Sequence, residues 1–296
     1  GFEGLEINGD YLTVKALGGV PTACFSEQIK VQILGDLNRR TVGYTNGIIG
    51  DPKDRMISIR PDNLTPITLP CPIVLDLPDF ELDGNTISMR ALDDLSGCAA
   101  MLATLTLIKN RKEVSNLYCI FTRAEEVGLI GARLIAADKM LPSDTIVISL
   151  EASSTLPGAL IGGGPVIRVG DANFTFDVEA ESVLIRAREK LLDRESGYRI
   201  QRQLMNGGTC EASAFIYHGY RATGIAFPLG NYHNSGIDGN VLPEFIDIDD
   251  FIGGIELILE SIQSTETRRL SRPWQKLSNL DVNQVSKLYK SSDTPY

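Results

Sequence analysis

Residues 1–88 carry short runs of alternating apolar and polar side chains, separated by glycine and proline. None of these runs has a persuasive helical period, and short apolar runs between turn residues predict β-strands. The clearest ones cover residues 29–34, 41–44, 56–59 and 73–75. Residues 1–88 are therefore predicted to form a small all-β domain, barrel-like or open.

After residue 88 the pattern changes to strands that alternate with helices. Residues 98–109 repeat apolar side chains at helical spacing, residues 117–121 are predicted to be a buried strand, and residues 145–150 form a continuous apolar strand. Further helices are expected over 131–139, 180–192, 211–218 and 249–263, and further strands over 198–204 and 221–227. This alternation predicts an α/β fold, a three-layer sandwich around a mostly parallel sheet, with the β-domain as an inserted unit.

These patterns divide the chain into three segments. Residues 1–88 are the all-β domain, residues 89–264 the α/β domain, and residues 265–296 a polar extension that is either docked or disordered. The net charge of -10 disfavours a nucleic-acid or anionic-membrane partner, because both require a basic face. The apolar stretches are too short to span a membrane and no leader opens the chain, so a cytoplasmic protein is expected.

Two adjacent carboxylates, Glu125 and Glu126, follow the predicted strand 117–121 where the chain turns at glycine. Neighbouring side chains near a strand end need not face the same way. One glutamate of the pair could then hold a metal while the other acts as a general base on metal-bound water. Acidic pairs on surface loops are common, so this pair taken alone favours a surface loop.

Four candidate ligands lie where strands end or turn into helices. They are Asp93, Glu126, Glu151 and His233. Ligands in such sheets gather beyond the carboxyl ends of the strands, so these side chains are expected to meet. Oxygen donors with one imidazole suit Zn²⁺, Mn²⁺ or Co²⁺, and a carboxylate shared by two ions would create a two-metal site. Glu125 would take the proton from the activated water.

Each candidate also has a purely structural alternative. Asp93 could simply cap the following helix, because acidic residues satisfy the free N–H groups of a first turn. Glu151 could be a surface carboxylate at a strand end, and His233 a turn histidine. His218 is better explained as a helix-terminal partner for free carbonyl groups than as a ligand.

Four motifs together resemble a known family. They are Ala91-Leu92-Asp93-Asp94 with Gly97, Glu125-Glu126-Val127-Gly128-Leu129 with Gly131, Gly207-Gly208-Thr209, and Tyr232-His233. Their order and spacing resemble the tetrahedral-type aminopeptidases, which are dinuclear metallopeptidases that include glutamyl and deblocking enzymes. In that family a barrel-like dimerisation domain precedes the Asp-Asp motif, as residues 1–88 do here.

The resemblance implies a role for each candidate residue. Asp93 would bridge two metal ions through a cis Asp93-Asp94 peptide, and Glu125 would be the general base. Glu126 and His233 would bind one ion and Glu151 the other. The cofactors would be two divalent ions, zinc first, with cobalt or manganese as alternatives. The activity implied is removal of N-terminal residues from peptides by a homo-oligomer built from dimers, up to a dodecamer.

The sequence departs from the family pattern in three places. Glu151 stands where the family usually has aspartate, and Cys210-Glu211 stands where Asp-Ala is typical. The family's His-x-Asp motif, which should precede the β-domain, is absent from the sequence, and His218 and His233 cannot replace it by position. We therefore expect either that an N-terminal piece of the catalytic domain is missing or that the protein has at most one competent metal site.

Two rival functions stay open at this stage. A related dinuclear carboxypeptidase or deacylase would carry an α/β domain in place of the all-β domain of residues 1–88. A catalytically degenerate homologue would bind peptides or a partner without turnover, and metal content would identify it.

Overall fold

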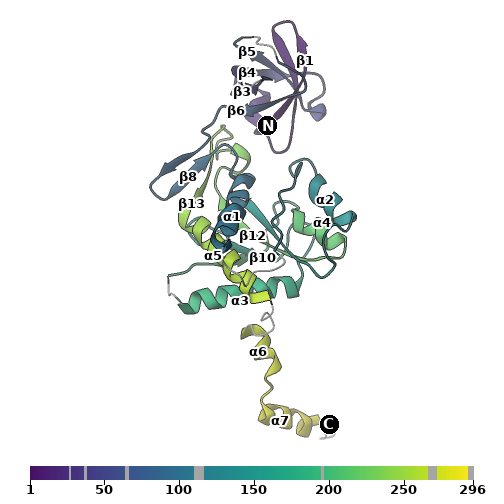
Figure 1. Cartoon of the computed structure of the whole chain (residues 1–296), viewed down its shortest axis with the longest axis vertical. Coiled ribbons are helices and arrows are strands. Elements are labelled where there is room, and N and C mark those ends of the chain that lie inside the picture. Colours follow the sequence, from purple (N-terminus) through teal and green to yellow (C-terminus); the bar gives the residue numbers. More distant parts are fainter. Residues whose placement is uncertain are drawn as a thin grey trace.

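The computed structural model describes residues 1–26, 28–36, 39–63, 67–109, 117–194, 197–265 and 272–292. These residues form a closed barrel, two further sheets and the helices α1 to α7 (Figure 1). The barrel lies at one end of the molecule and α7 at the other, with the second and third sheets between them. Among the described residues, no helix combines the length and apolar character needed to cross a bilayer.

The barrel closes in the order β1-β2-β5-β4-β3-β6, with β6 pairing back to β1. Alternate side chains point inward because successive residues of a strand face opposite ways, and Leu12, Val14, Ile57 and Ile59 are fully buried. The prediction of an all-β, barrel-like unit is confirmed. Its strands are β1 (Phe2–Asn8), β2 (Tyr11–Ala16), β3 (Lys30–Leu34), β4 (Arg40–Ile48), β5 (Met56–Pro61) and β6 (Cys71–Leu75).

The central sheet has the order β11-β10-β12-β9. The pairs β9–β12 and β10–β11 are parallel, whereas β10 runs antiparallel to β12, so the sheet is mixed. A three-stranded antiparallel sheet, β13-β8-β7, lies between the barrel and this sheet. The strands are β7 (Glu81–Asp83), β8 (Thr86–Met89), β9 (Ile146–Ser154), β10 (Val166–Arg168), β11 (Gln201–Gln203), β12 (Arg221–Leu229) and β13 (Glu244–Asp247).

Helices cover the central sheet, as the mixed α/β pattern predicted. Leu184 of α3, Ile225 of β12 and Leu257 of α5 are fully buried in one cluster. Gly254 lets α5 approach β12 closely, since a Cβ there would lie 2.2 Å from the ring of Phe227. The helices are α1 (Leu92–Ile108), α2 (Ile130–Ala137), α3 (Val178–Arg194), α4 (Glu211–Tyr217), α5 (Ile248–Ser264), α6 (Arg272–Ser278) and α7 (Val282–Ser292).

The predicted buried strand over residues 117–121 is wrong. The segment has no regular secondary structure and pairs with no strand among the described residues, and Tyr118 and Phe121 are 54% and 46% exposed. The apolar run indicates side chains that favour burial. A β-strand, however, forms only when a neighbouring strand pairs with its backbone N–H and C=O groups. In the part of the chain described here, β9 pairs with β12 alone. A groove of about 510 Å³ lies between β9, α1 and this segment.

Of residues 265–296, the structure describes Thr265 and residues 272–292. The backbone N–H of Arg272 donates to Glu189 at 2.9 Å, and its guanidinium pairs with Asp193 at 2.5 Å. The extension therefore contacts α3 through Arg272 and continues as α6 and α7 away from the barrel (Figure 1).

Candidate metal centre

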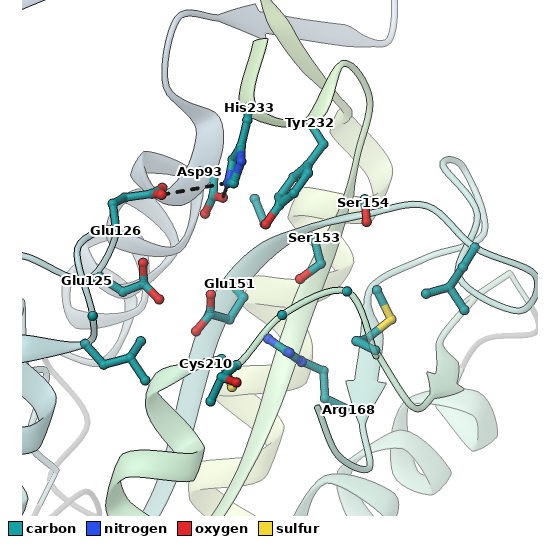
Figure 2. Close-up of a pocket in the computed structure, with 18 of the residues that line it drawn as sticks. Asp93, Glu125, Glu126, Glu151, Ser153, Ser154, Arg168, Cys210, Tyr232 and His233 are labelled. Atoms are coloured by element: carbon teal, nitrogen blue, oxygen red, sulfur yellow. Dashed lines mark ion pairs between the residues drawn. The ribbon is translucent and has the colours of Figure 1, made fainter. Parts of the chain in front are cut away.

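A cavity of about 420 Å³ opens beside the central sheet, below the barrel. Its lining combines the acidic residues that the sequence singled out with the Gly207-Gly208-Thr209 loop and the Tyr232-His233 turn. Figure 2 shows the carboxylates of Glu125 and Glu151 facing each other across this space. Segments from six separate parts of the sequence thus meet at one place.

Asp93 lies at the start of α1, where the backbone is not helical, and the Asp93-Asp94 peptide bond is cis, as the resemblance implied. Its backbone N–H donates to the carboxylate of Glu244 at 3.1 Å. Glu244 is 3% exposed, and its pKa is raised to about 7 by burial and by the charge of Asp93. Asp94 accepts the N–H of Gly97 at 3.0 Å and so caps the helix, while Asp93 is left to face the cavity.

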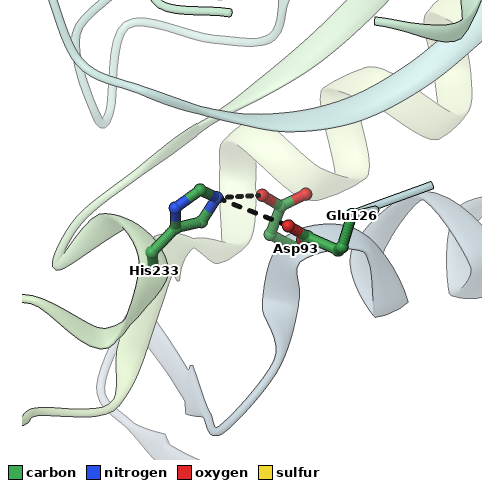
Figure 3. Close-up of side chains that lie close together, drawn as sticks. All are labelled: Asp93, Glu126 and His233. Atoms are coloured by element: carbon green, nitrogen blue, oxygen red, sulfur yellow. Dashed lines mark ion pairs between the residues drawn. The ribbon is translucent and has the colours of Figure 1, made fainter. Parts of the chain in front are cut away.

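Asp93, Glu126 and His233 form one close group (Figure 3). Nε2 of His233 lies 3.6 Å from a carboxylate oxygen of Asp93 and 3.8 Å from one of Glu126. One ligand atom from each residue falls within 4.8 Å of the others. Ligands bound to one zinc ion at about 2.1 Å in tetrahedral geometry lie roughly 3.4 Å apart, so the spacing fits a shared cation.

A tight turn before α2 presents both glutamates of the acidic pair. The carbonyl of Glu125 accepts the N–H groups of Gly128 and Leu129, and Gly128 has a φ of +118°. A Cβ at Gly131 would lie 2.7 Å from the carbonyl oxygen of Arg123, so only glycine allows the turn to close. The turn sends the side chain of Glu126 toward His233 and that of Glu125 toward Glu151 (Figure 2).

His233 follows β12 in a short turn and has a left-handed backbone with a φ of +55°. Its ring stacks on Tyr232 with 3.8 Å between the ring centroids, which fixes its orientation. Burial opposes a charge on the imidazole, but the bond to Asp93 and the field of Glu126 outweigh it and raise the pKa of His233. The imidazole ring of His233 thus lies among negatively charged groups, and the same environment would favour a bound cation.

A loop of the barrel touches this group. A Cβ at Gly19 would lie 1.7 Å from Nδ1 of His233, and a Cβ at Gly18 would lie 3.1 Å from a carboxylate oxygen of Glu126. Gly18 also has a φ of +59°, in the region that favours glycine. The glycine pair allows the barrel backbone to approach the candidate ligands more closely than any side chain would permit.

Glu125 lies beside the close group and is well placed to hold a proton. Burial, and then the charges of Glu151, Glu126 and Asp93, raise the pKa of Glu125 to about 8. A carboxyl group with a pKa near neutrality can accept and return a proton at physiological pH. A cation bound nearby would lower this pKa again by favouring the charged carboxylate.

Glu151 was expected at the end of a strand over 145–150, but it lies inside β9, paired in register with Ala226 of β12. The strand extends to Ser154 because β12 continues alongside it to Leu229. Glu151 is 8% exposed and accepts the hydroxyl of Ser149 at 2.9 Å. Burial raises the pKa of Glu151 to about 7, and the nearby Arg168 opposes that shift. Glu151 faces the cavity but does not belong to the close group of Asp93, Glu126 and His233.

Of the Cys210-Glu211 pair, Cys210 lines this cavity, whereas Glu211 lines the neighbouring groove beside β9 and α1. Burial raises the pKa of the Cys210 thiol to about 12, and the thiol lines the cavity. The carboxylate of Glu211 accepts a short hydrogen bond from the hydroxyl of Thr122. His218 ends α4 and lies outside the cavity lining, in agreement with its interpretation as a helix-terminal residue.

Sequence reasoning missed three contributors to the site: Glu244, Arg168 and the Gly18-Gly19 pair. Glu244 and Arg168 lie on β13 and β10, and the pairing of those strands decides where their side chains point. The glycine pair looked like an ordinary strand breaker. The left-handed backbone at Gly18 is a local feature of the glycine pair. The contact between Gly19 and His233, by contrast, depends on how the barrel packs against the central sheet.

The donor set and its spacing fit a divalent cation. Two carboxylates and one imidazole at mutual distances of 3.6 and 3.8 Å are a typical partial coordination sphere for zinc. Without a cation, the carboxyl groups of Glu125, Glu151 and Glu244 all have raised pKa values because they lie buried and close to other acids. A positive ion would remove this repulsion.

The comparisons with known proteins agree with this fold and site. The family model of the M42 glutamyl aminopeptidases matches residues 67–248, more than half of the chain. A curated protein of Acetivibrio thermocellus, described as "Putative aminopeptidase", is 27% identical over 190 residues, which cover 62% of this chain and 53% of that protein. The chain therefore belongs to the M42 family, and it spans about half the length of the curated relative it matches.

Solved structures show the same fold. The chain resembles the TET aminopeptidase of the archaeon Thaumarchaeota archaeon SCGC AB-539-E09 with a TM-score of 0.72 and 21% identity, covering 90% of this chain and 81% of that one. It resembles the TET1 peptidase of Pyrococcus horikoshii, described as assembling into a tetrahedron or a large octahedral shell, with a TM-score of 0.71 and 20% identity over 88% and 79% of the two chains.

Proposed function

We propose that this protein is a metal-dependent aminopeptidase that removes N-terminal residues from peptides at the cavity around Asp93. The observation that carries the proposal is the convergence of Asp93, Glu126 and His233 within 4.8 Å, with the carboxyl group of Glu125 beside them. Membership in a family of glutamyl aminopeptidases supports the choice of substrate.

Asp93, Glu126 and His233 would hold one divalent ion, zinc first among the candidates. Glu151, with Asp93 as a bridge, would hold a second ion. Such ions polarise the scissile carbonyl group and lower the pKa of water. Glu151 supplies a longer side chain than the aspartate usual at this position in the family.

The protein's own groups would move the proton and orient the substrate. Glu125 takes the proton from the attacking water and delivers it to the leaving amine. Glu244 holds the backbone at Asp93, and Tyr232 holds the ring of His233, so that both ligands keep their orientation. The acidic wall of the cavity attracts the free α-ammonium group of the peptide.

The topology of the first domain argues against the rival carboxypeptidase or deacylase, which carries an α/β domain there. Strands β1 to β6 form a closed β-barrel instead. By analogy with the shell-forming and dodecameric TET peptidases, we also propose a homo-oligomeric assembly. A cytoplasmic location stays a prediction.

The test is to titrate metal-free protein with Zn²⁺, Co²⁺ and Mn²⁺ by calorimetry and to assay the loaded protein on aminoacyl-p-nitroanilides and short peptides. We expect at least one ion to bind per chain and N-terminal residues to be released. Metal binding without turnover would favour the catalytically degenerate homologue. No metal binding at all would refute the proposed centre.

A further inference from the structure

An apolar groove lies between α2 and α4, which are neighbours on one flank of the central sheet (Figure 1). Three alanines, Ala132 and Ala136 on α2 and Ala212 on α4, are fully buried in one cluster, and their small side chains let the two helices pack closely. Ile130 and Leu134 lie one turn apart on α2 and stay exposed. The helix pair thus buries its small residues and leaves large apolar side chains uncovered.

The groove has a volume of about 680 Å³. Four large apolar side chains line it and remain partly exposed, Leu134 at 59%, Tyr217 at 76%, Ile130 at 43% and Phe174 at 39%. Single exposed apolar side chains are ordinary on a protein surface, but a contiguous group of them in a hollow marks a binding surface. The groove is therefore suited to a ligand that brings apolar side chains out of water.

A buried carboxylate holds the parts of the groove together. Asp171 is 4% exposed, and one of its oxygens accepts the backbone N–H of Phe174 at 2.9 Å. Its other oxygen accepts the backbone N–H of Cys210 at 3.0 Å and a short hydrogen bond from the hydroxyl of Ser213 on α4. Asp171 thus fixes the loop that carries Phe174 against the start of α4. The groove is preformed, so a ligand does not have to order it.

The groove and the cavity of the candidate metal centre share part of their lining. Leu129, Arg133 and Thr209 line both of them. A peptide whose first residue lies in the cavity beside Asp93 can therefore continue over these three residues into the groove. This continuity connects the apolar surface to the proposed reaction.

The charge of the lining changes between the cavity and the groove. Asp93, Glu125 and Glu126 make the cavity acidic, whereas no carboxylate is found among the described residues that line the groove. The cation Arg133 lies where the two meet. The α-ammonium group of a peptide is attracted to the acidic cavity and repelled by Arg133, so the N-terminus enters the cavity and the following residues enter the groove.

A second copy of the chain is a poorer occupant of this surface. In a two-fold symmetric contact, both copies present the same patch. The groove of one copy would then meet the groove of the other, and the lining described here offers Arg133 no carboxylate in return. A peptide substrate brings its apolar side chains without a second cation.

We propose that this groove binds the residues that follow the first residue of a peptide substrate and selects peptides with apolar side chains at those positions. The inference rests on the proposed aminopeptidase function, and it names the class of peptide on which the site acts. Apolar side chains that enter the groove leave water together with its exposed lining, and this burial favours binding. Polar side chains at the same positions gain no such contribution.

The experiment uses the zinc-loaded full chain and two tetrapeptide amides that share their first residue, chosen as the one released fastest from aminoacyl-p-nitroanilides. One peptide continues with three leucines and the other with three glutamines. We expect kcat/KM to favour the leucine peptide by about tenfold or more, because each leucine side chain in the groove leaves water. The p-nitroanilide carries no residue beyond its leaving group and supplies the reference rate.

Two substitutions in the groove should weaken this preference. Leu134→Gln should reduce the ratio of the two kcat/KM values by about threefold or more, because an amide then faces the apolar side chains of the peptide. Tyr217→Gln should change the ratio in the same direction from the α4 side. Both side chains are largely exposed, so neither substitution removes a core contact.

Leu102→Gln is the matched control. Leu102 is a leucine of α1 with 56% exposure, close to that of Leu134, and it lines neither the cavity nor the groove. The ratio should stay within about twofold of the wild type, as expected for a surface substitution away from the ligand. Equal kcat/KM values for the two peptides in the wild type would overturn the inference. A preference that both Leu134→Gln and Tyr217→Gln leave unchanged would overturn it as well.

Sedimentation of the same variants tests the rival occupant. Dissociation of an oligomer in Leu134→Gln, with an unchanged preference between the peptides, would assign the groove to a contact between copies and overturn the inference. An unchanged sedimentation coefficient with a reduced preference would support the peptide as the occupant.

Binding without turnover separates this inference from the proposed function. Fluorescence anisotropy with the leucine peptide, labelled at its C-terminus, measures its affinity for the zinc-loaded protein. Weaker binding in Leu134→Gln, with no release of N-terminal residues from any substrate, would keep the groove and remove the aminopeptidase. Release from p-nitroanilides without any preference between the two peptides would keep the aminopeptidase and remove the role of the groove.

Discussion

The backbone of Gly19 and the ring of His233 are in direct contact, so close that a Cβ at residue 19 would overlap Nδ1 at 1.7 Å. The barrel is therefore part of the wall of the candidate metal centre, and its loop limits how the histidine can turn. This contact joins a residue near the start of the chain to one more than two hundred positions later.

Replacing Gly19 by alanine should move His233 away from Asp93 and Glu126, because the added methyl group occupies the place of the imidazole. We expect the affinity for Zn²⁺ to fall by about tenfold or more, in the range seen when residues that orient ligands are lost. Calorimetric titration would measure it. Gly197→Ala is the control, since a Cβ at Gly197 meets nothing within 4 Å. Equal zinc affinity in both variants would contradict the contact.

Removing the imidazole itself should have a larger effect. His233→Ala deletes one of three ligands in the close group, and we expect a loss of zinc affinity on the order of 100-fold or more. His218→Ala, at the end of α4 and outside the cavity lining, is the matched control and should bind zinc like the wild type. A larger loss of zinc affinity in His218→Ala than in His233→Ala would assign the metal to His218.

Glu125→Gln should separate metal binding from turnover. The amide keeps the shape of the side chain but cannot accept the proton, so turnover should fall by about 10²- to 10⁴-fold. Zinc affinity should change much less, because Glu125 does not belong to the close group of ligands. Zinc affinity and turnover are measured on the same variant. A parallel loss of both would show that Glu125 is a ligand.

The metal-free protein should lose stability as the pH rises. The folded-state pKa values of Glu125 and Glu151 are raised to about 8 and about 7, above the ordinary value of 4.5. At pH values between the ordinary and the raised pKa, the folded state binds more protons than the unfolded state. The free energy of unfolding therefore falls with increasing pH. The slope from one such group is on the order of 1 kcal/mol per pH unit.

Urea unfolding with a chelator at about pH 6 and about pH 8.5 would measure this slope. Glu151→Gln should flatten it, because the amide does not titrate. Zn²⁺ should stabilise the wild type more at the higher pH, where the carboxylates are already charged. A metal-free protein that becomes more stable over the same interval would contradict the raised pKa values.

The barrel could be predicted from residues 1–88 because its signals are local: short alternating runs, frequent prolines and glycines, and no helical period. The acidic residues were expected to meet because they lie where predicted strands end or turn into helices, and Glu126 does lie at the site although the strand predicted before it is absent. Asp93, Glu126 and His233 do meet, whereas Glu151 lies slightly apart and inside β9. Its side chain was expected at a strand end because the sequence does not show how far β12 accompanies β9.

Residues 117–121 show where local reasoning fails. Their apolar side chains indicate correctly that the segment favours burial. No pattern within five residues, however, shows whether a neighbouring strand is present to pair with it. Arg168 was passed over for a related reason. A charged residue at the end of a short apolar run looks exposed, and only the pairing of β10 with β12, opposite Gly224, shows that it is enclosed.

Strand β9 also affects how copies of this chain behave when they are concentrated. In the described part of the chain, one of its edges carries backbone groups without a strand partner, next to the apolar groove. Such an edge is a template on which a second molecule can add a strand, and repeated addition produces aggregates.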